Sequence, residues 1–202
     1  MSTSSSTALG LVLLLLFASK AQGRSAPAGQ RRTSTPPVGT GRQLPLERTG
    51  GDDFALWARE RLALAVVDLA SLEPPVDPTR IDDVAIAIVA QWAHETAKGR
   101  AEFNYNLGGW TARSGDDFHA ATDRLSGRAF RWTAYPDLPT AVEDQIKRLA
   151  VGFPGAWALL LADPTSDAWI RELGRANYYT ASPDDYARAW ASLAQEIRRL
   201  PR

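Results

Sequence analysis

The chain has 202 residues, of which 23 are Lys or Arg and 23 are Asp or Glu, so its formal net charge is zero. Because no net positive charge attracts a polyanion, nucleic acid is not an expected partner. Cysteine is absent, which excludes disulfides, thiol catalysis, cysteine-ligated metal and a lipoprotein anchor. The first fifty or so residues differ in composition from the rest, and about 150 remain for one globular domain.

Residues 1–23 are predicted to be a signal peptide or an N-terminal anchor. Residues 8–18 are apolar apart from Gly10, a length typical of a signal-peptide core and shorter than the ~20 residues of a membrane-spanning helix. Ala21 and Gly23 are the small residues that signal peptidase prefers before a cleavage site. No Lys or Arg precedes the run, so an uncleaved anchor and an incidental apolar tail are alternatives. We expect export to the periplasm, the cell envelope or the extracellular space, with residues 8–18 as a membrane tether if cleavage fails.

Residues 24–51 are predicted to form a disordered linker. They are rich in Pro, Gly, Ser, Thr and Arg, with Pro36 and Pro37 adjacent, and such a composition buries too little apolar surface to order itself. The folded domain is therefore expected to span residues 52–202.

Helical periodicity follows the linker directly. Apolar residues recur at helical spacing between Phe54 and Leu69, which predicts an amphipathic helix that ends before two adjacent prolines. A second helix is expected to open with Thr79 and Asp82 in a capping-box arrangement and to end at Gly99. Its predicted buried face comprises Ile81, Val84, Ala85, Ile88, Val89 and Trp92.

The helical period fails between residues 104 and 135. Short segments over residues 117–122 and 129–133 flank a turn at residues 126–127, and this pattern predicts a small β-hairpin. Helices are then expected over residues 138–150 and 165–173. A last helix is predicted to use Ser182 as its N-cap. The element order favours a mainly α fold.

Glu95 continues the apolar stripe of the second predicted helix, because it lies seven residues after Ile88 and three after Trp92. Burial and the negative end of the helix dipole both disfavour the charged form of a carboxyl at such a position. A carboxyl that keeps its proton is what a general acid needs, as in glycoside hydrolysis. The alternative is a side chain that reaches solvent and pairs with Lys98 or Arg100.

The stretch QWAHETAKGRAEFNYNLGGW, residues 91–110, resembles the core motif of bacterial β-N-acetylglucosaminidases, in which a helix ends in Glu-Thr and an Asn-Leu-x-Gly loop follows. This family includes autolysins and the muramidase-like domain of flagellar rod assembly. Residues 130–135 and the helix after them resemble its Phe-Arg-x-Tyr segment. Residues 178–186 resemble its Tyr-x-Thr-(x)-x-Pro-x-x-Tyr ending. The resemblance covers roughly residues 81–200.

The resemblance implies a lysozyme-like fold with a small β-hairpin lobe beside the cleft, and cleavage of the β-1,4 bond after N-acetylglucosamine in peptidoglycan. Glu95 is then the proton donor, and glycan strands are the partner. The family places a second acid on the hairpin, where Asp123 is the nearest match and Asp116 and Asp117 are its rivals. A separation above ~6.5 Å would favour inversion. A third possibility is that the N-acetyl group of the substrate replaces the second acid.

Four residues are expected to bind substrate: Asn106, Trp110, Tyr178 and Tyr179. Asn106 either fixes its Gly-rich loop or binds an acetamido group. Gly108 stands where the family usually has an aromatic residue, so Trp110 is interpreted as the displaced ring surface or as a core residue. Tyr178 matches the family tyrosine beside the catalytic acid, and Tyr179 is its near neighbour. Which of the two hydroxyls faces the cleft is open.

No metal or cofactor is expected, because His94 and His119 lack the paired spacing of zinc ligands. As the helical neighbour of Glu95, His94 is predicted to point about 100° away from it. Two alternatives to an ordinary exported enzyme remain open. One is a non-catalytic glycan-binding or scaffold module, and the other is an autolysin-like enzyme delivered as a toxin or phage component.

Overall fold

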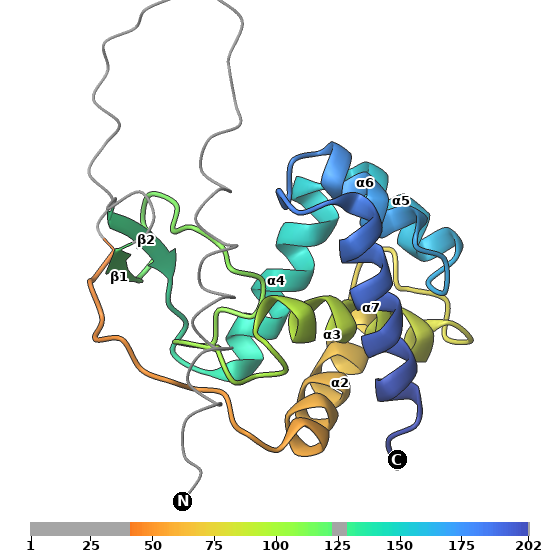
Figure 1. Ribbon diagram of the computed structural model, residues 1–202, viewed down its shortest axis with the longest axis horizontal. Helices are drawn as coiled ribbons and strands as arrows, with labels where there is room; N and C mark the ends of the chain where they lie inside the picture. The colour runs from red at the N-terminus through yellow and green to blue at the C-terminus, as the bar shows by residue number, and fades with distance from the viewer. Residues whose placement is uncertain (1–40, 123–128, 202) are drawn as a thin grey trace, which may run out of the picture.

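The computed structural model describes residues 41–122 and 129–201. Over these residues the protein is mainly helical with a small antiparallel sheet, which confirms the predicted mainly α class (Figure 1). The apolar run at residues 8–18, the first part of the predicted linker, the hairpin turn and Asp123 lie outside the described residues. Within them, no helix is long and apolar enough to cross a membrane. The helices are α2 (Phe54–Ala70), α3 (Ile81–Glu95), α4 (Leu138–Gly152), α5 (Pro154–Ala162), α6 (Ala168–Arg175) and α7 (Pro183–Arg198).

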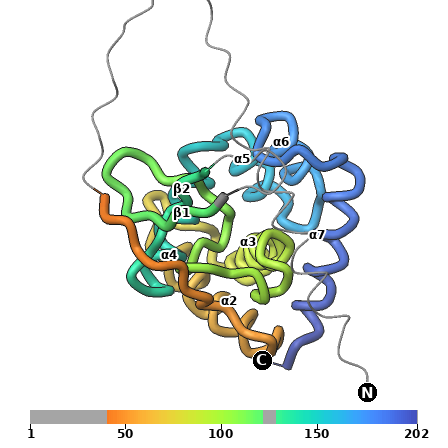
Figure 2. Tube along the Cα trace, turned by 60° about the vertical axis from the view of Figure 1, so that its left-hand side comes forward, coloured from red at the N-terminus to blue at the C-terminus, as the bar shows by residue number. Residues whose placement is uncertain are grey.

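Helix α3 is the central element of the fold. It packs against α2 on one side and α7 on another, and Figure 2 shows it surrounded by the other helices, with the hairpin to one side. The sequence predicted one buried face, yet all of its residues except Asp82, Asp83 and His94 are buried. A helix that is apolar all round is a core helix, so the last residue of α3 lies inside the protein.

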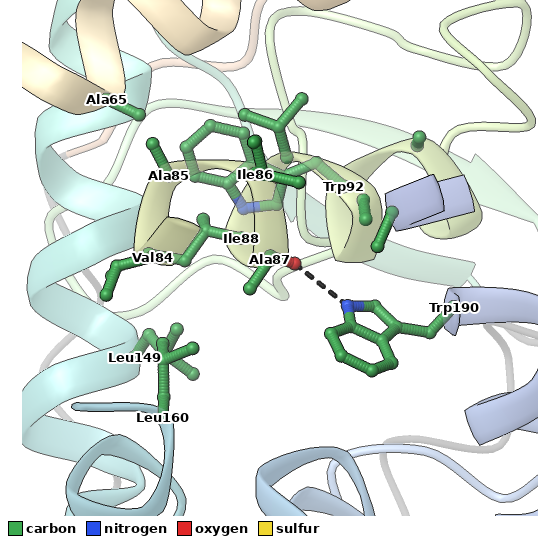
Figure 3. Packing of buried hydrophobic residues seen from close by; sticks show 14 of the residues in the cluster. Ala65, Val84, Ala85, Ile86, Ala87, Ile88, Trp92, Leu149, Leu160 and Trp190 are labelled. Atoms are coloured by element: carbon green, nitrogen blue, oxygen red, sulfur yellow. Dashed lines mark hydrogen bonds between the residues drawn. The ribbon is translucent and has the colours of Figure 1, made fainter. Parts of the chain in front are cut away.

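The contacts of α3 explain its small and branched side chains. Trp190 of α7 donates from its indole Nε1 to the carbonyl of Ala87 over 2.9 Å (Figure 3). Its ring also meets that of Trp169 edge to face, with centroids 5.6 Å apart. Ala65 of α2 and Leu160 of α5 belong to the same core. Alanines on α3 let these neighbours approach closely, and the dense packing holds the helix in one position.

The predicted hairpin is present at the expected place. Strand β1 (Phe118–Thr122) pairs antiparallel with β2 (Ala129–Thr133), with His119 opposite Trp132. Residues directly opposite each other in such a pair place their side chains on the same face of the sheet. His119 and Trp132 therefore share one face.

Two predicted side-chain caps are not formed. Arg80, not Thr79, precedes α3, and no side chain caps that end, because Thr79 instead hydrogen-bonds Asp77. Ser182 is the N-cap residue of α7, as expected, but its side chain makes no capping hydrogen bond. Helix α5 was not predicted, because its residues are almost uniformly apolar and show no helical period.

Residues 41–51, here called the N-terminal strap, are ordered against the domain, so the predicted linker was wrong for this segment. Gln43 forms a parallel bridge with Phe118 and Arg48 an antiparallel bridge with Phe103. Thr49 donates its backbone N–H to the carbonyl of Glu102 over 3.2 Å. Composition missed the strap because it is held by backbone hydrogen bonds more than by apolar burial.

A buried ion pair connects the strap, α2 and the loop after α3. Glu102 has no exposed surface and accepts from Nη2 of Arg61 at 2.7 Å. The same carboxylate accepts from the indole of Trp57 at 2.7 Å and from the hydroxyl of Thr49 at 3.1 Å. These donors come from α2 and from the strap, so the hydrogen bonds to Glu102 attach the loop after α3 to both segments.

Removal of the strap is expected to destabilise the domain. A chain that begins at Asp52 loses several backbone hydrogen bonds to the hairpin and the loop, and we expect a stability loss of about 3 kcal/mol. For a domain of this size this corresponds to a melting temperature roughly 6–12 °C lower than that of a chain beginning at Gly41. Thermal unfolding followed by circular dichroism measures the difference in melting temperature between the two chains. Equal melting temperatures would show that the strap contributes nothing.

Candidate active site

A pocket of about 100 Å³ lies between the end of α3, the hairpin and the strap. This volume is enough for several water molecules or for part of a ligand. Its lining is mostly apolar and contains one carboxyl, that of Glu95, among the described residues. The lining residues are Leu46, Glu95, Ala101, Phe103, Asn106, Gly109, His119, Ala121 and Trp132.

Glu95 is buried, with 4% of its surface exposed, and it is the last residue of α3. The alternative of a solvent-exposed pair with Lys98 or Arg100 is wrong. Lys98 binds Glu196 at 2.7 Å, and the guanidinium of Arg100 donates to the carbonyl of Ala97. The burial predicted from the apolar stripe is thereby confirmed.

Glu95 is held by a buried chain of hydrogen bonds. The hydroxyl of Tyr186 donates to Oε1 of Glu95 at 2.5 Å. The amide of Gln91, one helical turn before Glu95, donates to Tyr186 at 3.3 Å and to Tyr178 at 2.9 Å. Tyr178 in turn donates to the carbonyl of Gly108 at 2.9 Å. The network therefore links the carboxyl to the Asn-Leu-Gly-Gly loop through α3.

Both tyrosines of this network keep their protons. Burial first, and the negative charge of Glu95 second, raise the pKa of Tyr178 and of Tyr186 well above the ordinary value for a phenol. Each hydroxyl thus remains a hydrogen-bond donor at any working pH. Tyr186 is the tyrosine that contacts Glu95. The sequence analysis placed it at the end of the segment over residues 178–186 that resembles the family and gave it no contact with Glu95.

Tyr179 has a different role from the one predicted for it. Its hydroxyl donates to the carbonyl of Ile170 at 2.9 Å, on α6, and burial raises its pKa to about 12. Its ring stacks on that of Tyr186 with centroids 3.8 Å apart and an interplanar angle of 7°. His94 also meets the ring of Tyr186 edge to face, with centroids 4.3 Å apart. Tyr179 and His94 therefore hold the ring of Tyr186, and neither donates a hydrogen bond to Glu95.

The Glu-Thr-x-x-Gly segment, residues 95–99, forms the tight turn at the end of α3. Thr96 donates its hydroxyl to the carbonyl of Trp92 at 2.8 Å and accepts the backbone N–H of Gly99 at 3.0 Å. Gly99 has a φ of +84°, and a Cβ there would lie 2.4 Å from the ring of Trp57. Only glycine fits this turn without strain, and the turn directs the chain away immediately after Glu95.

Asn106 and Trp110 both stabilise the loop after α3. The Asn106 amide donates to the carbonyl of Trp110 and accepts its N–H, both at 2.8 Å, so its side chain fixes the loop. The indole of Trp110 donates to Gln145 at 2.6 Å and packs against Phe153 and Tyr178. A Cβ on Gly108 would lie 2.4 Å from that indole. Trp110 thus fills the space that a side chain at position 108 would need.

The two described rivals for the second acid are engaged in other contacts. Asp116 accepts from Arg148 at 2.8 Å and from the backbone of Arg113. Asp117 accepts two hydrogen bonds from Arg42, and these lower its pKa. Neither aspartate lines the pocket. Asp123 lies outside the described residues, so its assignment stays a prediction.

His119 is the second titratable residue in the pocket lining, and the sequence analysis considered it only as a metal ligand. It is 5% exposed, and burial lowers its pKa to about 4, so the imidazole is neutral at neutral pH. Among the described residues, no cluster of His, Asp and Glu is arranged to hold a metal ion. The pocket therefore presents a carboxyl and a neutral imidazole.

Comparison with known proteins gives no relative. No family model, no curated protein and no solved structure matches this chain. The functional argument accordingly rests on the surroundings of Glu95 and on the sequence segments described above.

The contact from Tyr186 predicts the effect of a conservative substitution. Tyr186→Phe removes the hydroxyl that donates to Glu95 but keeps the ring that stacks on Tyr179. If Glu95 is catalytic, we expect kcat to fall about tenfold with KM nearly unchanged, because one hydrogen bond to the reacting group is lost.

The matched control is Tyr179→Phe, whose hydroxyl donates to Ile170 and not to Glu95. We expect it to leave kcat within about twofold, since its lost hydrogen bond is of similar strength and lies elsewhere. Steady-state kinetics on a soluble oligosaccharide compares the two variants. Equal losses in both would show that the ring stack, and not the hydroxyl at Glu95, matters.

Proposed function

We propose that the protein is a glycoside hydrolase in which Glu95 is the general acid. One observation carries this proposal: a carboxyl that is 4% exposed lines a pocket while a buried tyrosine and glutamine network holds it in place. Structural carboxylates inside proteins usually have a cationic partner, as Glu102 has in Arg61. Among the described residues, Glu95 instead receives a neutral hydroxyl on Oε1, and none of them bonds Oε2, which supports a role for that oxygen toward a substrate.

Within that class, the particular enzyme we propose is a lysozyme-like β-N-acetylglucosaminidase that cleaves peptidoglycan after N-acetylglucosamine. The supporting features are the Glu-Thr helix end, the glycine at position 99, the Asn-Leu-Gly-Gly loop and the hairpin beside the pocket. Each has a structural reason at this pocket, and together they match the motif order of the bacterial glucosaminidases. Export through the N-terminal segment would bring such an enzyme to its substrate.

The chemistry requires that Glu95 protonate the glycosidic oxygen as the bond breaks. The hydroxyl of Tyr186 can then stabilise the carboxylate that forms, since it already lies 2.5 Å from Oε1. Gln91 keeps that hydroxyl oriented by donating to its oxygen. The sugar carbon that loses the glycosidic bond must take up the oxygen of a water molecule, either directly, with Asp123 as the base that activates the water, or after the N-acetyl group of the substrate has attacked that carbon.

The experiment is digestion of purified peptidoglycan by the full chain, beside Glu95→Gln, with released fragments reduced and identified by mass spectrometry. Reduced N-acetylglucosamine ends that vanish in the variant are the expected result. Reduced muramic acid ends that vanish in the variant would still support Glu95 as the general acid, but would show that the other glycosidic bond is cut. No fragments from the wild-type chain would overturn the proposal of an enzyme.

A second candidate is a non-catalytic glycan-binding module. It is favoured by the lining of the pocket, in which Glu95 is the one carboxyl among the described residues. Sedimentation with insoluble peptidoglycan tests this alternative. Retained binding without release of fragments would make it the better proposal.

A further inference from the structure

One residue of the pocket lining, His119, has a buried polar atom that no described residue bonds. Nδ1 of His119 is inaccessible to solvent and has no hydrogen-bond partner within the described residues. Burying such an atom is unfavourable unless something pairs with it. A residue that lines a pocket and has a buried polar atom without a hydrogen-bond partner is a candidate for ligand contact.

The position of His119 follows from the strand register. His119 and Ala121 are two residues apart on β1, so they lie on the same face, and both line the pocket that contains Glu95. Trp132, directly opposite His119 on β2, lines it too. The histidine and the carboxyl therefore belong to one cavity, contributed by two different elements of the fold.

We propose that Nδ1 of His119 hydrogen-bonds a polar group of a neutral sugar ring in this pocket, which makes His119 a specificity-determining residue. This inference rests on the proposed function and names a contact for its substrate. A neutral imidazole offers one donor and one acceptor nitrogen, and a sugar hydroxyl can satisfy either. The aromatic ring of Trp132 and the apolar lining suit the face of the same sugar.

An acidic group is the poorer occupant. Burial keeps the imidazole of His119 uncharged, and the other titratable group of the lining is the carboxyl of Glu95. No cation among the described lining residues would balance a ligand carboxylate. The pocket should accordingly prefer an oligosaccharide of N-acetylglucosamine over an oligosaccharide that bears carboxylates.

The test uses three substitutions of His119 in the Glu95→Gln chain, so that binding is measured without turnover. His119→Phe keeps the aromatic volume and removes both nitrogens. His119→Asn places an amide near the position of Nδ1, and His119→Gln places it near that of Nε2. The probe is the tetramer of N-acetylglucosamine, with its Kd measured by isothermal titration calorimetry and the melting temperature of each variant recorded.

We expect His119→Phe to weaken the tetramer about tenfold while its melting temperature stays equal or rises, because an unpaired buried polar atom is removed. His119→Asn should recover most of the affinity and His119→Gln should not. Unchanged affinity in His119→Phe would overturn the inference. So would better recovery by Gln than by Asn, and this comparison decides the matter even if the Phe variant fails to fold.

The failure of the proposed function would look different. If the wild-type chain releases no fragments from peptidoglycan and the Glu95→Gln parent does not bind the tetramer, both the enzyme and its sugar contact are excluded. If the wild-type chain releases fragments and the His119 variants bind the tetramer as well as the parent does, the proposed enzyme stands and only the role of His119 is wrong.

Discussion

Glu95→Gln is expected to lower the rate of glycan release by about a thousandfold, the scale on which a general acid contributes. The substituted amide is nearly the same size as the carboxyl, and its oxygen can still accept from Tyr186, so the hydrogen-bond network should persist. What is lost is the proton that the leaving oxygen needs. The melting temperature should therefore stay within about 3 °C of the wild type, which corresponds to roughly 1 kcal/mol.

The matched control is Glu196→Gln, which removes a partly exposed carboxylate that pairs with Lys98 on the surface. A pair of this kind is worth about 0–1 kcal/mol, so activity and melting temperature should both be close to wild type. Fragment release is quantified by mass spectrometry under identical protein loading. Residual activity above about one tenth of wild type in Glu95→Gln would remove Glu95 from the proton-donor role. A large loss of melting temperature would instead mark it as structural.

Arg61→Met is expected to have the largest effect on stability, with a loss of about 4 kcal/mol. The Glu102 carboxylate has no exposed surface. Of its donors in the described part of the chain, the substitution leaves the indole of Trp57 and the hydroxyl of Thr49. An uncompensated buried charge is much more costly than the loss of an exposed pair. Chemical denaturation followed by tryptophan fluorescence measures the change in unfolding free energy.

The double variant Arg61→Met with Glu102→Leu separates this charge effect from simple loss of packing. When both charges are removed together, no group remains buried without a partner, and stability should recover by at least about 2 kcal/mol relative to the single variant. If the double variant is as unstable as Arg61→Met, then packing of the arginine side chain, not its charge, holds the loop after α3.

Local sequence signals predicted most of the elements correctly. The helical period gave α2 and α4 nearly to the residue, and the failure of that period gave both strands of the hairpin. Helix α5 was missed because a helix with apolar residues almost throughout has no polar face to create a period. The strap was missed because composition measures the capacity for apolar burial and not the backbone partners that a segment finds elsewhere in the chain.

The candidate site was only partly visible in the sequence. Glu95 could be found because its position on an apolar stripe is a property of one helix. Tyr186 could not be assigned to Glu95, since the two are 91 residues apart and the contact depends on how α7 packs against α3. Tyr178 and Tyr179 are adjacent in sequence, but only the packed structure directs one hydroxyl to Gly108 and the other to Ile170.

The sequence by itself thus predicted the class of secondary structure, the burial of Glu95 and the glycine in the turn after α3, because each depends on neighbours within a few residues. The end of α3 itself lies at Glu95, with Thr96 as its C-cap, and not at Gly99. Tertiary structure alone decided which hydroxyl contacts Glu95, which cation balances Glu102 and that His119 shares a pocket with Glu95. The physical reason is that pairing of buried polar groups requires atoms to meet within about 3 Å. Only the packing of distant segments brings them there.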